Sequence, residues 1–284
     1  MHRGKRGRLA GSAVLAVAII ALCVGTTPPP CAVPQEHKPP APNFLVFEKG
    51  EELTYEVSYL AIRLGTITTR CTAVDTVNGS ARYKTECLIR SYRGIPFVNL
   101  LTIFQSTVDG RFASVSFSTK ERVQDTLNKY IHYTFPAGRD VVYISERIGN
   151  DPIWDHYDTI PLEGKCWQDG LSLLFFARAH AHHRYTARVP VLIYHSKAFT
   201  TIRFGVKEEP MEIDAVDYPI ATRKLDGETG FTGIFGLTGD FEGWFTRDRA
   251  SIPVFAKMHV IIGSIRIQLI SWKKPHWKPP RHVT

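Results

Sequence analysis

The chain has 284 residues and a formal net charge of +8, with 35 Lys and Arg against 27 Asp and Glu. Four of the basic residues lie in residues 1–25, and four more lie in the C-terminal tail, at Lys273, Lys274, Lys278 and Arg281. The segment between them therefore has no net charge. The positive charge of the whole chain is thus no evidence for nucleic-acid binding, and we expect no nucleic-acid partner. The length allows one large β domain or two small ones.

The N-terminus has the pattern of a secretory signal peptide. Basic residues between His2 and Arg8 precede an almost uncharged apolar run at Leu9–Val24, and prolines begin at Pro28. The run is short for a transmembrane helix. We therefore predict that residues 1–25 are cleaved and that the protein is exported. The alternative is a membrane anchor that is not cleaved.

Residues 26–43 form a Pro-rich linker, and the folded domain is expected to begin at Phe44. Apolar residues alternate with polar ones from Leu53 to Tyr59 and again from Ile67 to Ala73, which is the pattern of half-buried strands. Asn78-Gly79 then predicts a hairpin turn. No second linker follows, so we predict a single β-rich domain over residues 44–272.

Cys71 and Cys87 lie at equal distances from Gly79 along the chain. A three-residue turn would place them opposite each other, and an exported protein is in the right compartment for a disulfide. A two-residue turn would pair Cys71 with Glu86 instead and leave two free thiols. We predict the disulfide and keep the free thiols as the alternative. Cys31 and Cys166 have no evident partners.

One helix is predicted, within a series of strands. Asp169 can cap its N-terminus, and Leu171, Leu174 and Phe175 recur at helical spacing. The intervening positions are also mostly apolar, so the helix should be buried against the sheet. A loop is expected before it at residues 149–165, and strands are expected near 101–108, 112–118, 129–135, 140–147, 186–194, 197–206, 211–216 and 220–225.

The C-terminal part predicts a long hairpin. Residues 241–245 form its first strand, and 252–270 alternate as one long strand whose apolar phase changes at Gly263. A β-bulge at Gly263 would explain the phase change and keep Met258 on the same face as Ile265. The expected fold is mainly β: one curved antiparallel sheet, an open or half barrel, of about a dozen strands with one buried helix.

Two polar clusters are candidates for metal binding or catalysis, but the sequence around them favours neither. Neighbouring residues on a helix point about 100° apart, so at most two of His180, His182 and His183 could share an ion. We expect no metal there and no cofactor. Asp155, His156 and Asp158 lie in the predicted loop, but no nucleophile motif accompanies them. We therefore predict no catalytic residue and no enzymatic activity.

Five glycines recur at every third residue between 227 and 239, with large apolar residues between them. The simpler interpretation is a loop folded onto the core. The alternative, which we test, is a mobile lid over an apolar cavity, since such a segment exposes much apolar surface. In this hypothesis Phe231 and Phe235 lie at the mouth of the cavity. Its floor is formed by three helix residues, Leu171, Leu174 and Phe175.

The tail at residues 273–284 is Pro-rich and basic, and we expect it to be unpacked. The alternative is contact with an anionic membrane or cell-wall polymer. Trp272 and Trp277 could then lie at the interface.

Three segments resemble one bacterial family of unknown function, numbered 3108. They are Lys49–Tyr59 (KGEELTYEVSY), Gln168–Arg178 (QDGLSLLFFAR) and the terminal hairpin that begins at Trp244. The resemblance covers roughly residues 44–271, and the glycine-dense segment departs from it. It implies a secreted, β-rich protein of Gram-negative type, in the periplasm or at the outer membrane, with no established activity. A fold-level analogy is to half-barrel lipoprotein carriers.

These observations favour an exported, non-enzymatic envelope protein that binds a lipid or another apolar ligand in its curved sheet. The first alternative is an adaptor that binds an envelope protein or a polysaccharide on the sheet face. The second is a polymer hydrolase that uses loop carboxylates. A large apolar cavity would favour the carrier, a filled core the adaptor, and converging carboxylates in a cleft the hydrolase.

Overall fold

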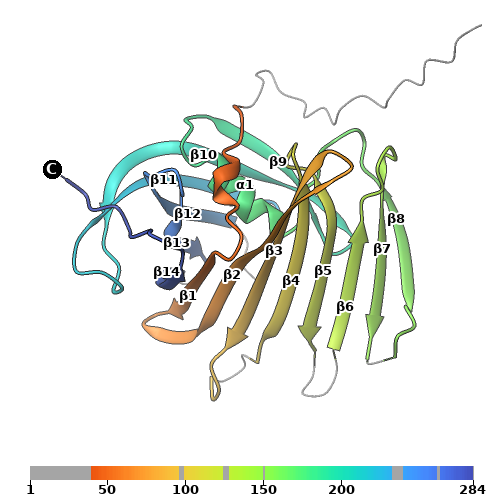
Figure 1. The fold of residues 1–284 in the computed structure, drawn as a ribbon. Helices are drawn as coiled ribbons and strands as arrows, with labels where there is room; N and C mark the ends of the chain where they lie inside the picture. The colour runs from red at the N-terminus through yellow and green to blue at the C-terminus, as the bar shows by residue number, and fades with distance from the viewer. Residues whose placement is uncertain are drawn as a thin grey trace, which may run out of the picture. The chain divides into compact units, whose positions relative to one another are not determined.

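In the computed structural model, the described residues are 40–95, 99–123, 128–149, 151–231, 239–260 and 263–283, all of which lie in one compact unit, Cys31–Thr284. These residues form a single antiparallel sheet of 14 strands, in the order β8-β7-β6-β5-β4-β3-β2-β1-β14-β13-β12-β11-β10-β9 (Figure 1). The edge strands are β8 and β9, so the sheet is open. The predicted fold class is confirmed.

The first eight strands are β1 (Glu52–Tyr59), β2 (Ile62–Val77), β3 (Ser80–Ser91), β4 (Leu101–Asp109), β5 (Ser114–Arg122), β6 (Asn128–Thr134), β7 (Val141–Ile148) and β8 (His156–Pro161). A 3-10 helix, η1 (Phe44–Val46), precedes them, and the helix α1 (Ser172–His180) follows them. The remaining strands are β9 (Thr186–Ile193), β10 (Ser196–Met211), β11 (Ile220–Thr229), β12 (Gly239–Thr246), β13 (Pro253–His259) and β14 (Ser264–Lys273).

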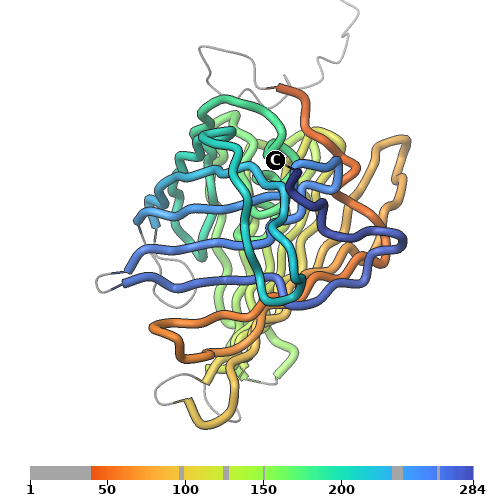
Figure 2. Tube along the Cα trace, turned by 90° about the vertical axis from the view of Figure 1, so that its left-hand side faces the viewer, coloured from red at the N-terminus to blue at the C-terminus, as the bar shows by residue number. Residues whose placement is uncertain are grey.

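The sheet is strongly curved, and its two halves lie across each other. Figure 2 shows β11–β14 running crosswise in front of the strands of the first half, and α1 lies between the two halves in Figure 1. Register shifts accompany the bending, for example between Arg203 and Lys207 of β10, where Gly205 has φ +65°. Extra residues of this kind bend a strand and increase its twist. The curvature therefore leaves an inner face on which α1 packs.

Alternating burial along the strands decides which side chains lie on this inner face. In β1, Leu53, Tyr55 and Val57 are buried while their neighbours are partly exposed. One buried cluster joins β2–β7 to the helix through Phe175, and another joins the helix to β9–β12 through Ala177. The helix therefore belongs to the cores of both halves, as its apolar sequence predicted.

The predicted long strand over residues 252–270 is wrong, because the structure has two strands, β13 and β14, in its place. They pair as a hairpin, with His259 opposite Ser264 and Met258 opposite Ile265. Gly263 has φ +80° and accepts a hydrogen bond from the Val260 backbone N–H, so it belongs to the turn. In this hairpin, even-numbered residues pair with odd-numbered ones, such as Met258 with Ile265. The apolar positions therefore shift from even to odd numbers across the turn, just as they would across a bulge.

The disulfide between Cys71 and Cys87 is also wrong, since both are buried free thiols. The turn has two residues, with Val77 opposite Ser80, and a register shift between Cys71 and Ala73 then places Cys71 opposite Thr85. The cysteines are thus diagonal neighbours, typically about 7–8 Å apart. Burial raises the pKa of Cys71 to about 11 and that of Cys87 to about 12. Cys166 is disulfide-bonded.

The C-terminal tail is packed, which corrects both the expectation of an unpacked end and the domain boundary at residue 272. Arg281 forms a backbone bridge to Ile220, and the Tyr218 hydroxyl donates to the Pro279 carbonyl at 2.9 Å. The rings of Trp272 and Trp277 meet edge to face, with centroids 5.4 Å apart. Backbone and side-chain partners within the domain thus overcome the low strand propensity of a Pro-rich segment.

Two further differences concern predicted loops. Residues 149–165 contain a strand, β8, which pairs with β7 although its sequence alternates weakly. The glycine-rich segment is shorter than predicted, because Gly227 lies within β11 and Gly239 begins β12. Residues 232–238, and with them Phe235, lie outside the described residues.

Candidate functional site

A cavity of about 370 Å³ lies between the inner face of the sheet and α1. Nearly all of its lining is apolar, and it comes from both halves of the sheet. Examples are Phe104 and Phe117 from the first half and Phe241, Phe245 and Ile267 from the second. This space exists because the sheet curves over a helix that is only nine residues long. The helix covers part of the inner face and leaves the rest unfilled.

The structure brings three of the five predicted cavity residues to this space. Leu171, directly before α1, and Leu174 of α1 line it, and Phe231 lines it from two residues after the end of β11. Residues three apart share one face of a helix, and Ala177 continues the same row. These residues thus lie where the hypothesis places them, and their part in binding a ligand stays a prediction.

Phe175 does not line the cavity, which corrects that part of the prediction. It is 3% exposed and stacks on Phe47 with ring centroids 5.1 Å apart. Leu173 and Leu174 line the cavity, and the next position, turned about 100° further, directs Phe175 into the core cluster that contains Phe47. The prediction for Phe235 falls outside the described residues.

The charged residues that line the cavity are both acidic. Glu242 is paired with Lys224, and Glu121 accepts a hydrogen bond from the Tyr194 hydroxyl at 3.3 Å. Among the described lining residues there is no Lys or Arg. The cavity therefore offers a long apolar wall with acidic groups and no cation that could pair with an anionic ligand.

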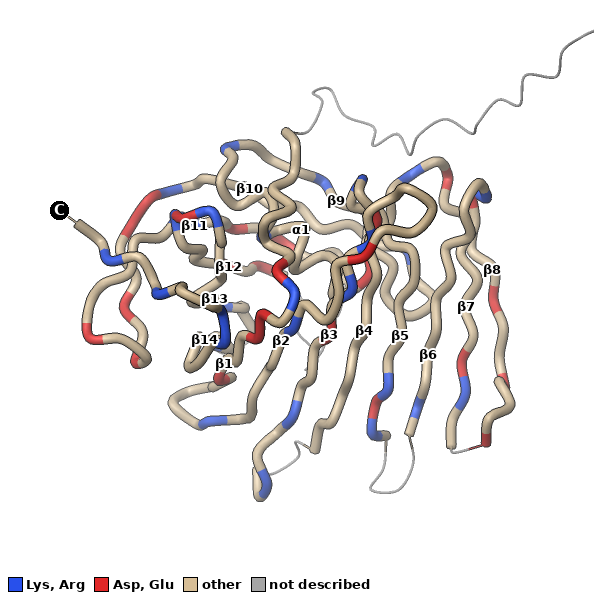
Figure 3. Tube along the Cα trace, viewed as in Figure 1, with Lys and Arg blue, Asp and Glu red and all other residues tan. Residues whose placement is uncertain are grey.

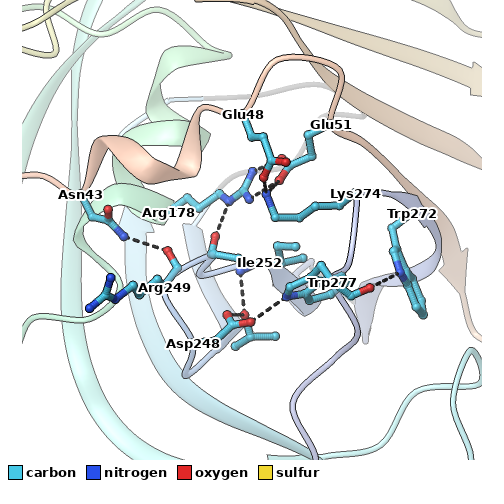
Figure 4. A network of polar contacts seen from close by, with 12 residues as sticks. Asn43, Glu48, Glu51, Arg178, Asp248, Arg249, Ile252, Trp272, Lys274 and Trp277 are labelled. Atoms are coloured by element: carbon cyan, nitrogen blue, oxygen red, sulfur yellow. Dashed lines mark hydrogen bonds and ion pairs between the residues drawn. The ribbon is translucent and has the colours of Figure 1, made fainter.

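A buried charged network surrounds Arg178 in the last turn of α1 (Figure 4). Arg178 is 2% exposed; its guanidinium donates to both carboxylate oxygens of Glu51, one at 2.8 Å, and to the Ala250 carbonyl at 3.0 Å. Lys274 lies 3.0 Å from Glu51 and also pairs with Glu48. Burial acts to raise the pKa of Glu51, but Arg178 and Lys274 together hold it below its ordinary value.

The same network continues into the β12–β13 turn and the tail. The Trp277 indole donates to Asp248 at 2.6 Å, and the Asn43 amide donates to the Arg249 carbonyl at 2.8 Å. Four segments that are far apart in sequence meet here: the N-terminal entry, α1, the turn and the tail. At its centre two cations, Arg178 and Lys274, face two carboxylates, Glu48 and Glu51, so this part of the network is electrically balanced and acts as a structural joint. Nothing in the sequence analysis indicated it.

The N-terminal end of α1 is held by the residue predicted to cap it. Asp169 lies just before the helix, and its carboxylate accepts from the backbone N–H groups of Leu171 at 2.9 Å and Ser172 at 2.7 Å. The hydroxyls of Ser106 and Ser114 donate to it at 2.7 and 2.8 Å. Burial raises the pKa of Asp169 in spite of these hydrogen bonds. Both ends of the helix are thus anchored. These contacts fix the orientation of the residues that face the cavity.

His180, His182 and His183 lie at the C-terminal end of α1, as predicted. The His180 ring is buried, with Nδ1 2.9 Å from the Phe176 carbonyl, and burial lowers its pKa to about 4. This environment therefore favours a neutral His180 ring that packs among aromatic side chains.

Charges of both signs are interspersed along the strands (Figure 3), in keeping with the neutral body of the sequence. Within the described residues, no helix is long and apolar enough to cross a membrane.

The fold and the cavity define an open-barrel β protein with a helix inside its curved sheet. The chain belongs to the family of proteins of unknown function DUF3108, whose model matches residues 54–270. The resemblance deduced from the sequence is thereby confirmed. A comparison with curated proteins found no match.

Three solved structures are similar in fold. The first is a β-barrel-like protein of the domain of unknown function DUF1849 from Brucella abortus, at TM-score 0.49 and 11% identity, which covers 78% of this chain and 96% of that one. The second is a candidate exported protein with a YmcC-like fold from Bacteroides fragilis, at TM-score 0.37, 10% identity and coverages of 80% and 97%. The third is a candidate lipoprotein from Parabacteroides distasonis, at TM-score 0.35, 9% identity and coverages of 80% and 96%. At these scores the likeness supports no inference about function.

Proposed function

We propose that this protein is an exported, non-enzymatic envelope protein that holds an apolar ligand, such as the acyl chain of a lipid or lipoprotein, in its cavity. The observation that carries the proposal is the apolar space of about 370 Å³ between α1 and the sheet. Ligand pockets typically measure about 300–1,000 Å³ and are lined mainly by hydrophobic and aromatic side chains. The cavity meets both criteria.

An apolar cavity of this size is expected to attract an apolar guest. Water has few hydrogen-bond partners on such walls, and an engineered apolar cavity of about 150 Å³ stays dry and binds benzene. Wall atoms that face empty space also lose their dispersion contacts. Filling the cavity with hydrocarbon would restore these contacts, and this gain is the proposed source of affinity.

The charges of the lining refine the ligand class. Glu121 and Glu242 are acidic, and no described lining residue is basic. Glu242 is paired with Lys224, but Glu121 accepts from the hydroxyls of Tyr194 and Thr119, so a free fatty-acid carboxylate inside the cavity would meet its like charge. The lining therefore favours a neutral chain or an acyl chain in ester or amide linkage, with its polar group outside the cavity.

Phe231, two residues after the end of β11, lines the cavity, as the lid hypothesis requires. Its ring packs with that of Phe241 against the same core cluster as Leu225. Phe235 lies outside the described residues, and its place at the mouth stays a prediction.

Export follows in this proposal from the basic start and the apolar run of residues 1–25, and the periplasm or the outer membrane is the proposed location. Contact between Trp272, Trp277 and a membrane stays a prediction. Both side chains are partly buried, so such a contact would use only their exposed parts.

The proposal is tested with the neutral fluorescent probe N-phenyl-1-naphthylamine and the purified mature protein. Replacing Leu174 by Asp places a charge on the cavity wall and should weaken probe binding at least tenfold. The melting temperature should change little, because the Leu174 side chain is only half-buried. Leu45→Asp is the matched control, since Leu45 is 62% exposed and lies outside the cavity.

Three outcomes would count against a ligand cavity. They are a wild type that does not bind the probe, equal binding by Leu174→Asp and wild type, and equal weakening by Leu45→Asp. In any of these cases the adaptor hypothesis becomes the better account. An anionic fatty-acid probe should bind more weakly than the neutral one if the acidic lining acts as proposed.

A further inference from the structure

The two edges of the open sheet approach each other along a seam that backbone pairing does not close. Strand β8 forms one edge and β9 the other. Three contacts lie around this seam: Gln168, after β8, forms an isolated backbone bridge with Val191 of β9; the Tyr133 hydroxyl of β6 donates to the Tyr194 carbonyl at 2.5 Å; and Lys197 of β10 lies 2.6 Å from Glu163, which follows β8. The turn between β9 and β10 therefore lies against β8, and it carries His195.

His195 meets a set of metal-binding side chains at this seam. His156 and Asp158 alternate along β8, so their side chains share one face, and Glu146 of β7 is directly opposite His156. One donor atom from each of His156, Asp158 and His195 lies within 4.8 Å of the others. The group thus draws two imidazoles and a carboxylate from both edges of the sheet.

The hydrogen bonds of His195 indicate which of its nitrogens is available. Nε2 lies 3.0 Å from Glu146 Oε2, and a carboxylate can only accept, so Nε2 carries a proton. Lys129 in turn lies 3.0 Å from Glu146 and holds that carboxylate in place. A carboxylate on the outer nitrogen of an imidazole is the usual support of a metal-bound histidine, because it orients the ring and raises its basicity.

The other nitrogen, Nδ1, lies 3.3 Å from Asp158 Oδ2. If His195 is neutral, its Nδ1 lone pair faces a carboxylate, and this pair is repulsive unless a cation lies between the two atoms. Ligands of a tetrahedral zinc ion at about 2.0–2.1 Å are separated from one another by about 3.3 Å. The spacing of these two atoms is therefore already that of two zinc ligands.

We propose that His156, Asp158 and His195 bind one divalent transition-metal ion of the zinc type, with Glu146 as the hydrogen-bond partner of His195. Imidazole nitrogen with carboxylate oxygen is a donor set that suits Zn²⁺. Its place in the fold gives the ion a role: it joins β8 to the β9–β10 turn and so ties the two edges of the open sheet. This inference does not depend on a ligand in the cavity.

A proton is the competing cation, because a charged His195 would bridge Glu146 and Asp158 without any metal. The two cases differ in a direct measurement. Titration of tag-free, chelator-treated protein with ZnCl₂ in a calorimeter should show one site per chain with micromolar or tighter affinity. A melting temperature about 5–10 °C higher is expected when zinc exceeds its dissociation constant about 100-fold, and EDTA should reverse this shift.

Single replacements locate the site. His156→Ala and Asp158→Asn should each weaken zinc binding by more than about 100-fold, and Glu146→Gln by about 10- to 100-fold. The double replacement His182→Ala with His183→Ala is the control, because it removes the other close histidine pair and should leave the affinity unchanged. Should a variant fail to fold, Co²⁺ added to the wild type is expected to give visible absorption bands that Zn²⁺ abolishes.

Three results would overturn the site. The first is no saturable zinc binding by the wild type, which would assign the bridge to a proton. The second is unchanged affinity in both His156→Ala and Asp158→Asn. The third is loss of binding in the His182→Ala, His183→Ala control, which would move the ion to the end of α1.

Discussion

Two polar clusters hold this open sheet together, and they differ in burial. The cluster around Arg178 and Glu51 is almost inaccessible, with side chains 2% and 3% exposed, whereas His195 and Asp158 at the seam are 29% and 39% exposed. A buried charge must keep its partners, because an unpaired one is very costly. A half-exposed cluster can exchange one partner for another at low cost. The cluster around Arg178 therefore suits a permanent structural joint. The cluster around His195 suits a site that can bind and release an ion.

The largest expected effect tests the permanent joint. Replacing Arg178 by Met leaves Glu51 with Lys274 as its remaining cation and the Ala250 carbonyl without its donor. The free energy of unfolding should fall by about 3–5 kcal/mol, measured by urea denaturation. The matched control is Arg70→Met, whose side chain is 39% exposed and pairs with Glu52 at the surface, and which should cost about 0–1 kcal/mol. Equal losses in the two variants would contradict the difference drawn between buried and exposed charges.

A smaller effect concerns pH and the buried imidazole of His180. Burial lowers its pKa to about 4, below the ordinary value of 6.5, so the unfolded chain binds the proton more readily than the folded one. The stability is therefore fully present above pH 6.5 and is lost as the pH falls toward 4. Such a shift corresponds to about 3 kcal/mol.

The measurement for His180 is urea denaturation at several pH values between 7 and 4. His180→Phe keeps an aromatic ring beside Phe176 and Phe204 and removes the titrating group, so its stability should vary less with pH in this window. Parallel pH profiles for wild type and variant would show that His180 is not the group responsible.

The smallest expected effect concerns thiol chemistry and tests the corrected pairing of the cysteines. Cys71 and Cys87 are buried, and burial raises the pKa of each, so neither should be alkylated in the folded protein at pH 8. After denaturation without reductant, both should become labelled, while Cys166 should remain in a disulfide. Detection of a disulfide-linked peptide that contains both Cys71 and Cys87 would contradict the free thiols of the structure.

Much of the fold follows from local patterns in the sequence. Alternation predicts Leu53, Tyr55 and Val57 as inward residues of β1, and helical spacing predicts α1 with Asp169 before it. These signals depend on neighbours within a few residues. The hairpin at Gly263 shows their limit, because a bulge and an even-length turn produce the same change of phase.

The candidate site was predictable only in part. Leu171 and Leu174 line the cavity and Phe175 does not, since a helix that is apolar all round does not reveal which of its sides faces the cavity. Arg178 and Glu51 are 127 positions apart, so no local pattern could indicate their pair. The approach of His195 to β8 likewise depends on how far the whole sheet curves, which is a property of all its strands together.

The central claim, that the cavity holds an apolar ligand, is tested most directly by native mass spectrometry of the protein purified from its own cell envelope. We expect a fraction of molecules to be heavier than the mature chain by the mass of a neutral lipid or acylated species. Leu174→Asp should lose this added mass, and Leu45→Asp should keep it. A wild type that carries only its chain mass and does not gain mass when incubated with neutral lipid would contradict the claim.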